Sequence, residues 1–148
     1  MQPRSTTTSS IGGSDVAIFA DTSFLYAAID ERDDRHADAV AALAAGGGGG
    51  LLTTSHVLGE TWTLTRRRLG HGAARALLEA VRSSRLYTIV TPGQRLEERA
   101  FEWLLQHDER EYSFVDAVSF VTMRDRGLDT ALAFDADFEA AGFSTLRG

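Results

Sequence analysis

The sequence predicts an α/β fold in which helices cover both faces of a mostly parallel central sheet. Two observations lead to this fold class. Short apolar runs, typical of strands buried on both faces, alternate along the chain with longer segments of helical apolar spacing. The chain also has 148 residues, of which 43% are hydrophobic, and shows no internal repeat, so we expect a single domain with a substantial core.

The first half of the chain is expected to contain two strands and four helices. In order, these are a strand over 16–20, helices over 21–30 and 35–43, a strand over 51–54, and helices over 55–69 and 73–84. The two strand sequences, VAIFA and LLTT, are short and carry no charge. Five glycines at 46–50 end one helix and allow a loose turn, and Gly70 separates the last two helices.

The second half continues the alternation of strands and helices. The expected elements are a strand over 87–90, helices over 94–107 and 113–127, a strand over 130–134, one or two helical turns over 136–142, and an edge strand over 144–147. Apolar residues at 96, 100, 101, 104 and 105 give the first of these helices its period. The second is apolar nearly all round for three turns, so we expect it to be buried.

Composition excludes several classes of protein. Residues 1–14 lack the apolar stretch of a secretory signal and are typical of a disordered Ser/Thr/Gly tail, so the folded domain is expected over 15–148. No apolar run is long enough to predict a membrane span. The absence of cysteine excludes disulfides and thiolate metal sites and fits a cytoplasmic protein. All 15 basic residues are Arg, and the net charge of −6 argues against broad, non-specific adhesion to nucleic acid.

Acidic residues follow two of the expected strands. Asp21 directly follows the first strand, and Asp135 directly follows the fourth. Since the carboxyl ends of parallel strands meet at the edge of the sheet where α/β proteins bind ligands, both carboxylates are expected at that edge. The structural alternative for Asp21 is that it serves only as the N-cap of the next helix.

Two further acids lie near the starts of helices. Asp116 is in the first turn of the buried helix, where an ionised carboxylate is costly unless it is paired or bound to a cation. A capping box with Ser113 is the structural interpretation of Asp116, and it is compatible with a functional one. Glu60 lies about 40° beyond Leu64, at the rim of the apolar arc of its helix. All four acids can therefore converge on one edge of the sheet.

Carboxylates that converge in this way repel one another and raise one another's pKa unless cations neutralise them. Hard divalent ions with oxygen ligands, Mg²⁺ or Mn²⁺, suit such a site. Such ions can activate a water molecule and stabilise the charge that develops on a phosphodiester during in-line displacement. The residues alone therefore predict metal-dependent phosphoryl chemistry.

These motifs, in this order, resemble the PIN domain, and specifically the VapC-type toxin ribonucleases of bacterial toxin–antitoxin pairs. The resemblance runs from about Val16 to Arg147 and is carried by FADTSFLYA, HVLGETWTL, YSFVDAVSFVTMRDRGL and ALAFDADFEAAGF. It implies a PIN-like three-layer sandwich over 15–148, with a mostly parallel central sheet flanked by helices. It also implies a metal-dependent endoribonuclease that acts on RNA.

The resemblance further assigns roles to individual residues. Asp21, Glu60, Asp116 and Asp135 would surround Mg²⁺ or Mn²⁺, and Asp137 would add a fifth carboxylate, directly or through water. Three hydroxyl residues would lie beside these ligands or contact the substrate phosphate: Thr22, Ser23 and Ser113. The implied partners are a VapB-like antitoxin, which would dock on the helices between Ser55 and Arg82, and a second copy of the chain.

Two other functions compete with this interpretation. A phosphatase of the haloacid dehalogenase type also places an Asp after its first strand, but it needs an acid two residues later, where this chain has Ser23, and a Lys, which this chain lacks. A non-enzymatic interaction module could instead receive an Arg of a partner in its acidic pocket. The run Arg66–Arg68 is typical of a solvated C-terminal helix end, where positive side chains interact favourably with the helix dipole. Alternatively, these arginines could hold RNA phosphates.

Overall fold

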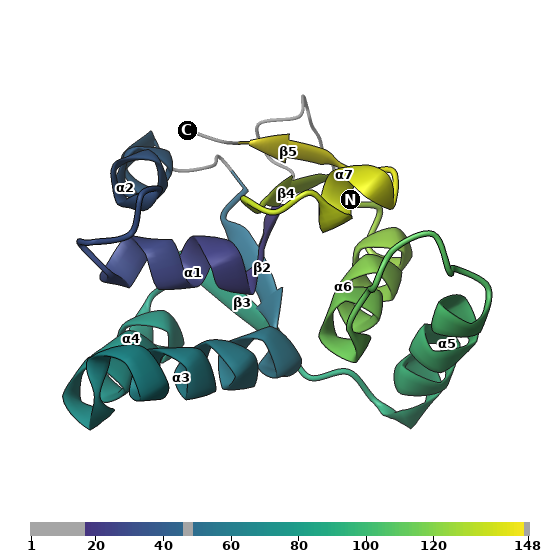
Figure 1. The fold of residues 1–148 in the computed structure, drawn as a ribbon, viewed down its shortest axis with the longest axis horizontal. Coiled ribbons are helices and arrows are strands. Elements are labelled where there is room, and N and C mark those ends of the chain that lie inside the picture. Colours follow the sequence, from purple (N-terminus) through teal and green to yellow (C-terminus); the bar gives the residue numbers. More distant parts are fainter. Residues whose placement is uncertain (1–16, 46–48, 147–148) are drawn as a thin grey trace, which may run out of the picture.

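The structure, a computed structural model, describes residues 17–45 and 49–146 (Figure 1). The tail expected over 1–14 and three of the five glycines, 46–48, lie outside the described residues. Within the described part of the chain, no helix is long and apolar enough to cross a membrane.

A five-stranded sheet lies at the centre of the molecule, with the strand order β3-β2-β1-β4-β5. The strands are β1 (Ile18–Ala20), β2 (Leu51–Thr54), β3 (Tyr87–Val90), β4 (Thr130–Leu132) and β5 (Ser144–Leu146). All four neighbouring pairs are parallel. The predicted α/β fold class is confirmed, and β5 is an edge strand as expected. The order reverses at β1, so the switch point where such sheets bind ligands lies between β1 and β4.

Helices flank the sheet in two groups. They are α1 (Thr22–Ile29), α2 (His36–Ala45), α3 (Ser55–Leu69), α4 (His71–Ser83), α5 (Gln94–Leu105), α6 (Phe114–Asp125) and the short α7 (Asp137–Ala140). In Figure 1, α1 to α4 lie on the left of the sheet and α5 and α6 on the right. This arrangement is the predicted three-layer sandwich, and it follows from right-handed crossovers that run in opposite directions on the two sides of β1.

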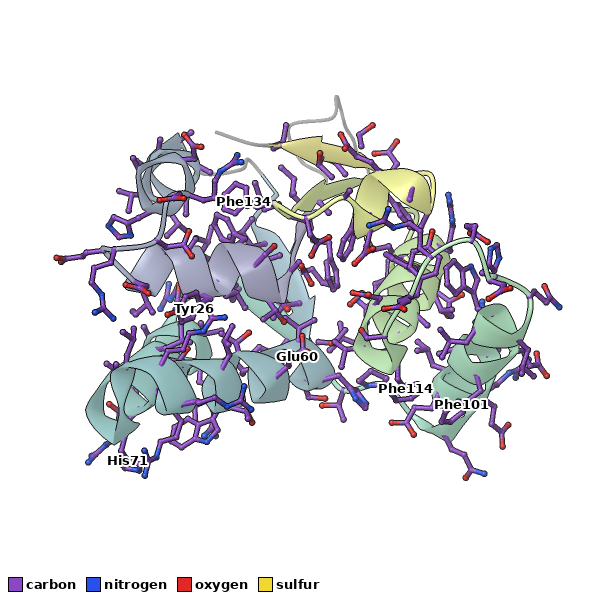
Figure 2. All side chains as sticks on the ribbon, in the orientation of Figure 1. Tyr26, Glu60, His71, Phe101, Phe114 and Phe134 are labelled. Carbon is purple, nitrogen blue, oxygen red and sulfur yellow. The ribbon has the colours of Figure 1, made fainter. Side chains whose placement is uncertain are left out.

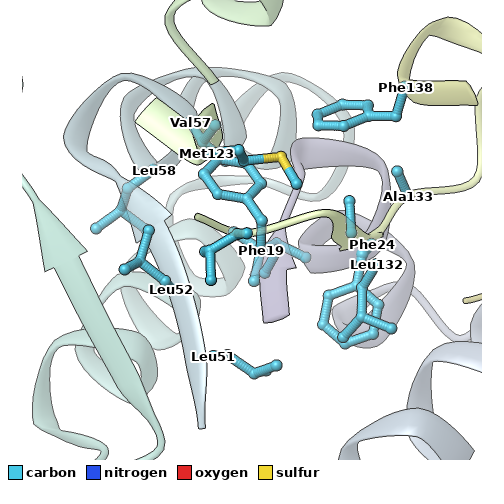
Figure 3. Close-up of a cluster of buried hydrophobic side chains, with 14 of the residues drawn as sticks. Phe19, Phe24, Leu51, Leu52, Val57, Leu58, Met123, Leu132, Ala133 and Phe138 are labelled. Atoms are coloured by element: carbon cyan, nitrogen blue, oxygen red, sulfur yellow. The ribbon is translucent and has the colours of Figure 1, made fainter. Parts of the chain in front are cut away.

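The main core joins both helical layers to the sheet (Figure 3). Phe19 of β1 is fully buried, and so are Val57 of α3 and Met123 of α6. Phe138 of α7 is also fully buried, with its ring centroid 4.9 Å from that of Phe120 and 6.0 Å from that of Phe19. Phe138 therefore anchors α7 in the core, because burying a large apolar side chain is favourable.

Two details of the sequence prediction are wrong. The strand expected over 130–134 ends at Leu132, because the backbone N–H of Phe134 leaves the sheet and donates to Ser23 Oγ at 3.0 Å. Asp135 therefore lies three residues beyond β4, not directly after it. On α3, Leu64 is only partly buried, whereas Thr61 is fully buried and satisfies its hydroxyl by donating to a carbonyl of its own helix.

Candidate active site

Asp21, a predicted site residue, lies where β1 ends and α1 begins, and it is the N-cap of α1. Its side chain accepts hydrogen bonds from the Ser23 backbone N–H at 3.4 Å and from Ser23 Oγ at 3.1 Å. Its own backbone N–H donates to the Leu132 carbonyl at 3.1 Å. Since Ser23 Oγ also accepts from Phe134, this one hydroxyl joins the turn after β1 to the turn after β4.

Glu60 is directed toward the start of α1. Thr22 Oγ1 donates to Glu60 Oε1 at 2.8 Å, across 38 residues of sequence. Thr22 is buried, while Glu60 is an exposed residue of α3. Figure 2 shows Glu60 near the centre of the molecule, at the end of α3 that faces α6. The Glu60 side chain, predicted at the rim of the apolar arc of its helix, therefore extends toward the edge of the sheet where α1 begins.

The remaining acids are held by local hydrogen bonds. Asp116 Oδ2 accepts from the Ser113 backbone N–H at 3.0 Å, and Ser113 Oγ accepts from the Asp116 N–H at 3.0 Å, which is the predicted capping box. Asp135 Oδ1 accepts from the Asp137 backbone N–H at 3.0 Å. Asp137 Oδ1 in turn accepts from Arg110 Nε at 2.8 Å.

The carboxylates of these acids interact electrostatically with one another. Burial, together with the charges of Asp135 and Asp116, raises the pKa of Asp21 to about 7. Burial also raises the pKa of Asp116 to about 6, with contributions from Asp137 and Asp135. The pKa of Asp135 is raised by burial and by the charges of Asp137 and Glu60. We call Asp21, Glu60, Asp116, Asp135 and Asp137 the acidic cluster, and three of its members, Asp21, Asp116 and Asp135, have raised pKa values.

The donor chemistry of the acidic cluster fits Mg²⁺ or Mn²⁺, which prefer carboxylate oxygens. Among residues 17–45 and 49–146, however, no three Asp, Glu, His or Cys side chains come close enough together to enclose an ion. The two observations are compatible, because charges interact over longer distances than a metal–ligand bond spans. Mg²⁺ also keeps several waters and takes only one or two direct carboxylate ligands in many sites. The assignment of individual ligands stays a prediction.

One residue of the site was missed by the sequence analysis. Arg110 lies in the connection between α5 and α6, and its guanidinium reaches Asp137 across 27 residues. Its charge lowers the pKa of Asp135, against the larger opposing effect of burial. No spacing rule connects a loop residue to a later turn, so the sequence held no signal for this pair. The basic run Arg66–Arg68 is exposed and lies in the last turn of α3, away from Glu60.

Comparison with known families decides what kind of fold carries the acidic cluster. The PIN domain family profile matches residues 18–144. This chain belongs to the PIN domain family. The haloacid dehalogenase-type phosphatase considered above is therefore not supported, and the interaction module is not favoured.

Solved and curated relatives of this PIN domain include a well-matched toxin. The chain is 52% identical to the 23S rRNA-specific endonuclease VapC20 of Mycobacterium tuberculosis over 130 residues, which is 88% of this chain and 98% of VapC20. The crystal structure of that protein, described as a sarcin–ricin loop cleaving toxin, matches with a TM-score of 0.84 at 49% identity and covers 89% of this chain and 100% of VapC20.

A second structure supports the fold alone. FitAcB from Neisseria gonorrhoeae matches with a TM-score of 0.62, at 17% identity, over 87% of this chain and 96% of that one. The expected resemblance to the PIN domain and to VapC-type toxins is thus confirmed across nearly the whole described chain.

Proposed function

We propose that this protein is a metal-dependent endoribonuclease of the VapC toxin type and that it cuts 23S rRNA in the sarcin–ricin loop. The observation that carries the proposal is the 52% identity to VapC20 over 98% of that relative. The electrostatically coupled acidic cluster at the β1/β4 switch point supports hydrolysis of a phosphodiester.

The chain's own residues prepare the site for this reaction. When bound, Mg²⁺ or Mn²⁺ would activate a water molecule and stabilise the charge that develops on the phosphate. Members of the acidic cluster would hold the ion, one or two of them directly and the others through water. Thr22 orients Glu60, Ser23 orients Asp21, and the backbone N–H of Ser113 orients Asp116. Carboxylates fixed in advance by such hydrogen bonds need little rearrangement when the ion and the RNA arrive.

The test is cleavage of intact ribosomes by the purified protein with Mg²⁺, with Mn²⁺ and with EDTA, mapped by primer extension on 23S rRNA. We expect one cut in the sarcin–ricin loop that requires metal. Asp116→Asn should lower the rate by a factor on the order of a hundred or more, because it removes a charged ligand. Asp125→Asn, at the far end of α6 in an exposed ion pair, is the matched control.

A second readout separates metal binding from catalysis. Mn²⁺ should raise the melting temperature of the parent protein, because the ion binds the folded site and not the unfolded chain, and the increase should be smaller for Asp116→Asn. Metal-independent cutting, or equal cutting by Asp116→Asn, would contradict the proposed chemistry. A metal-dependent cut elsewhere in RNA would contradict only the substrate.

We also propose a VapB-like antitoxin as the partner, docked on the surface of α3 and α4. This surface has a groove lined by Trp62, His71, Arg75, Leu78, Glu79, Arg82 and Ser83. The rings of Trp62 and His71 meet edge to face at 5.6 Å, and Figure 2 places His71 at the opposite end of α3 from Glu60. Co-purification with the product of the adjacent gene, lost in Trp62→Ala, would support this docking; unchanged co-purification of the variant would contradict it.

A further inference from the structure

The geometry points to Arg110 as the side chain that binds an RNA phosphate beside the acidic cluster. This role rests on the proposed ribonuclease function and deepens it, because it names how a negatively charged site accepts a negatively charged substrate. Arg110 would be a substrate-binding residue and not a ligand of the metal.

The first argument is charge. The acidic cluster brings five carboxylates together in a protein whose net charge is −6, and RNA adds one negative charge per phosphate. Within residues 17–45 and 49–146, Arg110 is the one cation that forms an ion pair with a member of the cluster. The run Arg66–Arg68 lies six or more residues beyond Glu60 along α3, at least about 9 Å away along the helix axis.

The second argument is the geometry of the guanidinium. Arg110 donates to Asp137 through Nε at 2.8 Å, and this is the hydrogen bond that the described part of the chain gives it. A guanidinium carries five N–H donors, so both terminal nitrogens keep a forked pair of donors that matches a phosphate. The Arg110 side chain is 41% exposed and that of Asp137 is 22% exposed, so a substrate can reach the pair from solvent. Asp137 would fix the direction of the fork before RNA arrives.

A purely structural ion pair is the competing explanation. Exposed ion pairs contribute little to stability, so this explanation predicts no effect on RNA binding once the fold is intact. The chain offers a matched control for it. Arg99 Nη1 lies 2.8 Å from Asp125 Oδ2, and both side chains are exposed to a similar extent. Asp125 and Asp116 are nine residues apart on α6, or about 13 Å along the axis.

The experiment measures binding of a fluorescent sarcin–ricin stem-loop RNA in Mg²⁺ at several salt concentrations. An Asp116→Asn background prevents cleavage, and Arg110→Gln, Arg110→Lys and Arg99→Gln are introduced into it. We expect Arg110→Gln to weaken binding roughly tenfold, as the loss of a charged hydrogen bond predicts. The slope of log affinity against log salt should fall by about one, the signature of one lost phosphate contact. Arg110→Lys should keep most of the salt dependence of RNA affinity. Arg99→Gln should bind RNA as tightly as the Asp116→Asn protein that carries no second substitution.

Cleavage kinetics in the parent protein give an independent readout. Arg110→Gln should raise KM more than it lowers kcat, with an unchanged melting temperature. An unchanged RNA affinity and salt slope in Arg110→Gln would overturn the inference while leaving the ribonuclease proposal intact. Tighter Mn²⁺ binding without any change in RNA binding would also overturn it, because Arg110 would then only shield Asp137. A parent protein that neither binds nor cuts RNA would overturn both proposals.

Discussion

At the scale of single residues, burial and hydrogen bonds have opposite effects on the carboxylate of Asp21. Asp21 is 4% exposed, caps α1, and accepts from Ser23, yet its pKa is raised to about 7 because burial and two neighbouring carboxylates oppose its charge. The structure confirms Asp21 as the cap of α1, and its predicted role in the site is compatible with that cap. A residue that is unfavourable when ionised is expected where a cation is to bind.

The raised pKa of Asp21 predicts how stability depends on pH without metal. Between about pH 4 and pH 7 the folded protein retains a proton that the unfolded chain has lost, so the free energy of unfolding decreases as pH rises through this window. Asp21→Asn should therefore raise the melting temperature by a few degrees at pH 8 in EDTA and give no gain near pH 4, measured by thermal unfolding. Asn also keeps the N-cap.

The control for this measurement is Asp125→Asn, which changes a carboxylate in an exposed ion pair. It should show no gain at pH 8. An equal shift of the Asp21→Asn variant at both pH values would mean that its effect does not come from the charge of Asp21.

At the scale of secondary structure elements, α5 and α6 form a separate layer, and α5 exposes two large apolar side chains, Phe101 and Leu105. Phe101 of α5 stacks on Phe114 of α6 (Figure 2), with ring centroids 4.5 Å apart. Phe101 is nevertheless 55% exposed, and Leu105, one turn later, is 86% exposed. Exposed apolar residues grouped on one helix face are typical of an interface. We propose that this face packs against a second copy of the chain, which is the homodimer that the resemblance implies.

If the proposed dimer forms, a single substitution in the interface should halve the mass of the protein in solution. Leu105→Glu places a charge on the interface and should convert the protein to a monomer in sedimentation velocity, with little effect on the melting temperature of the monomer. Val40→Glu is the control, since Val40 is 44% exposed on α2, outside this face. A parent protein that sediments as a monomer, or a Leu105→Glu variant that still sediments as a dimer, would contradict the α5 interface.

At the scale of the whole molecule, local patterns were enough for most of the fold. The bounds of β2, β3 and α3 match the expected ranges, because apolar runs and helical periods are properties of adjacent residues. The capping box of Ser113 and Asp116 was also predictable, since its partners are three residues apart. The alternation of strands and helices was enough to expect Asp21 and Asp135 at the same edge of the sheet.

Contacts between distant segments could not be predicted in this way. The early end of β4 depends on a hydrogen bond between Phe134 and Ser23, which are 111 residues apart. The pairs Thr22–Glu60 and Arg110–Asp137 likewise join segments that no local period connects. Each is a side-chain contact that exists only after the sheet and its helices have packed.

The position of β1 also determines when the site can exist during synthesis. β1 pairs with β4, so the turn that carries Asp135 reaches its place only after β4, more than 100 residues later in the chain, has been synthesised. Until then, the nascent chain has Asp21, Glu60 and Asp116 but lacks the last strands that close the site. An enzyme that cuts ribosomal RNA as proposed would therefore lack a complete site while the residues before β4 are being synthesised.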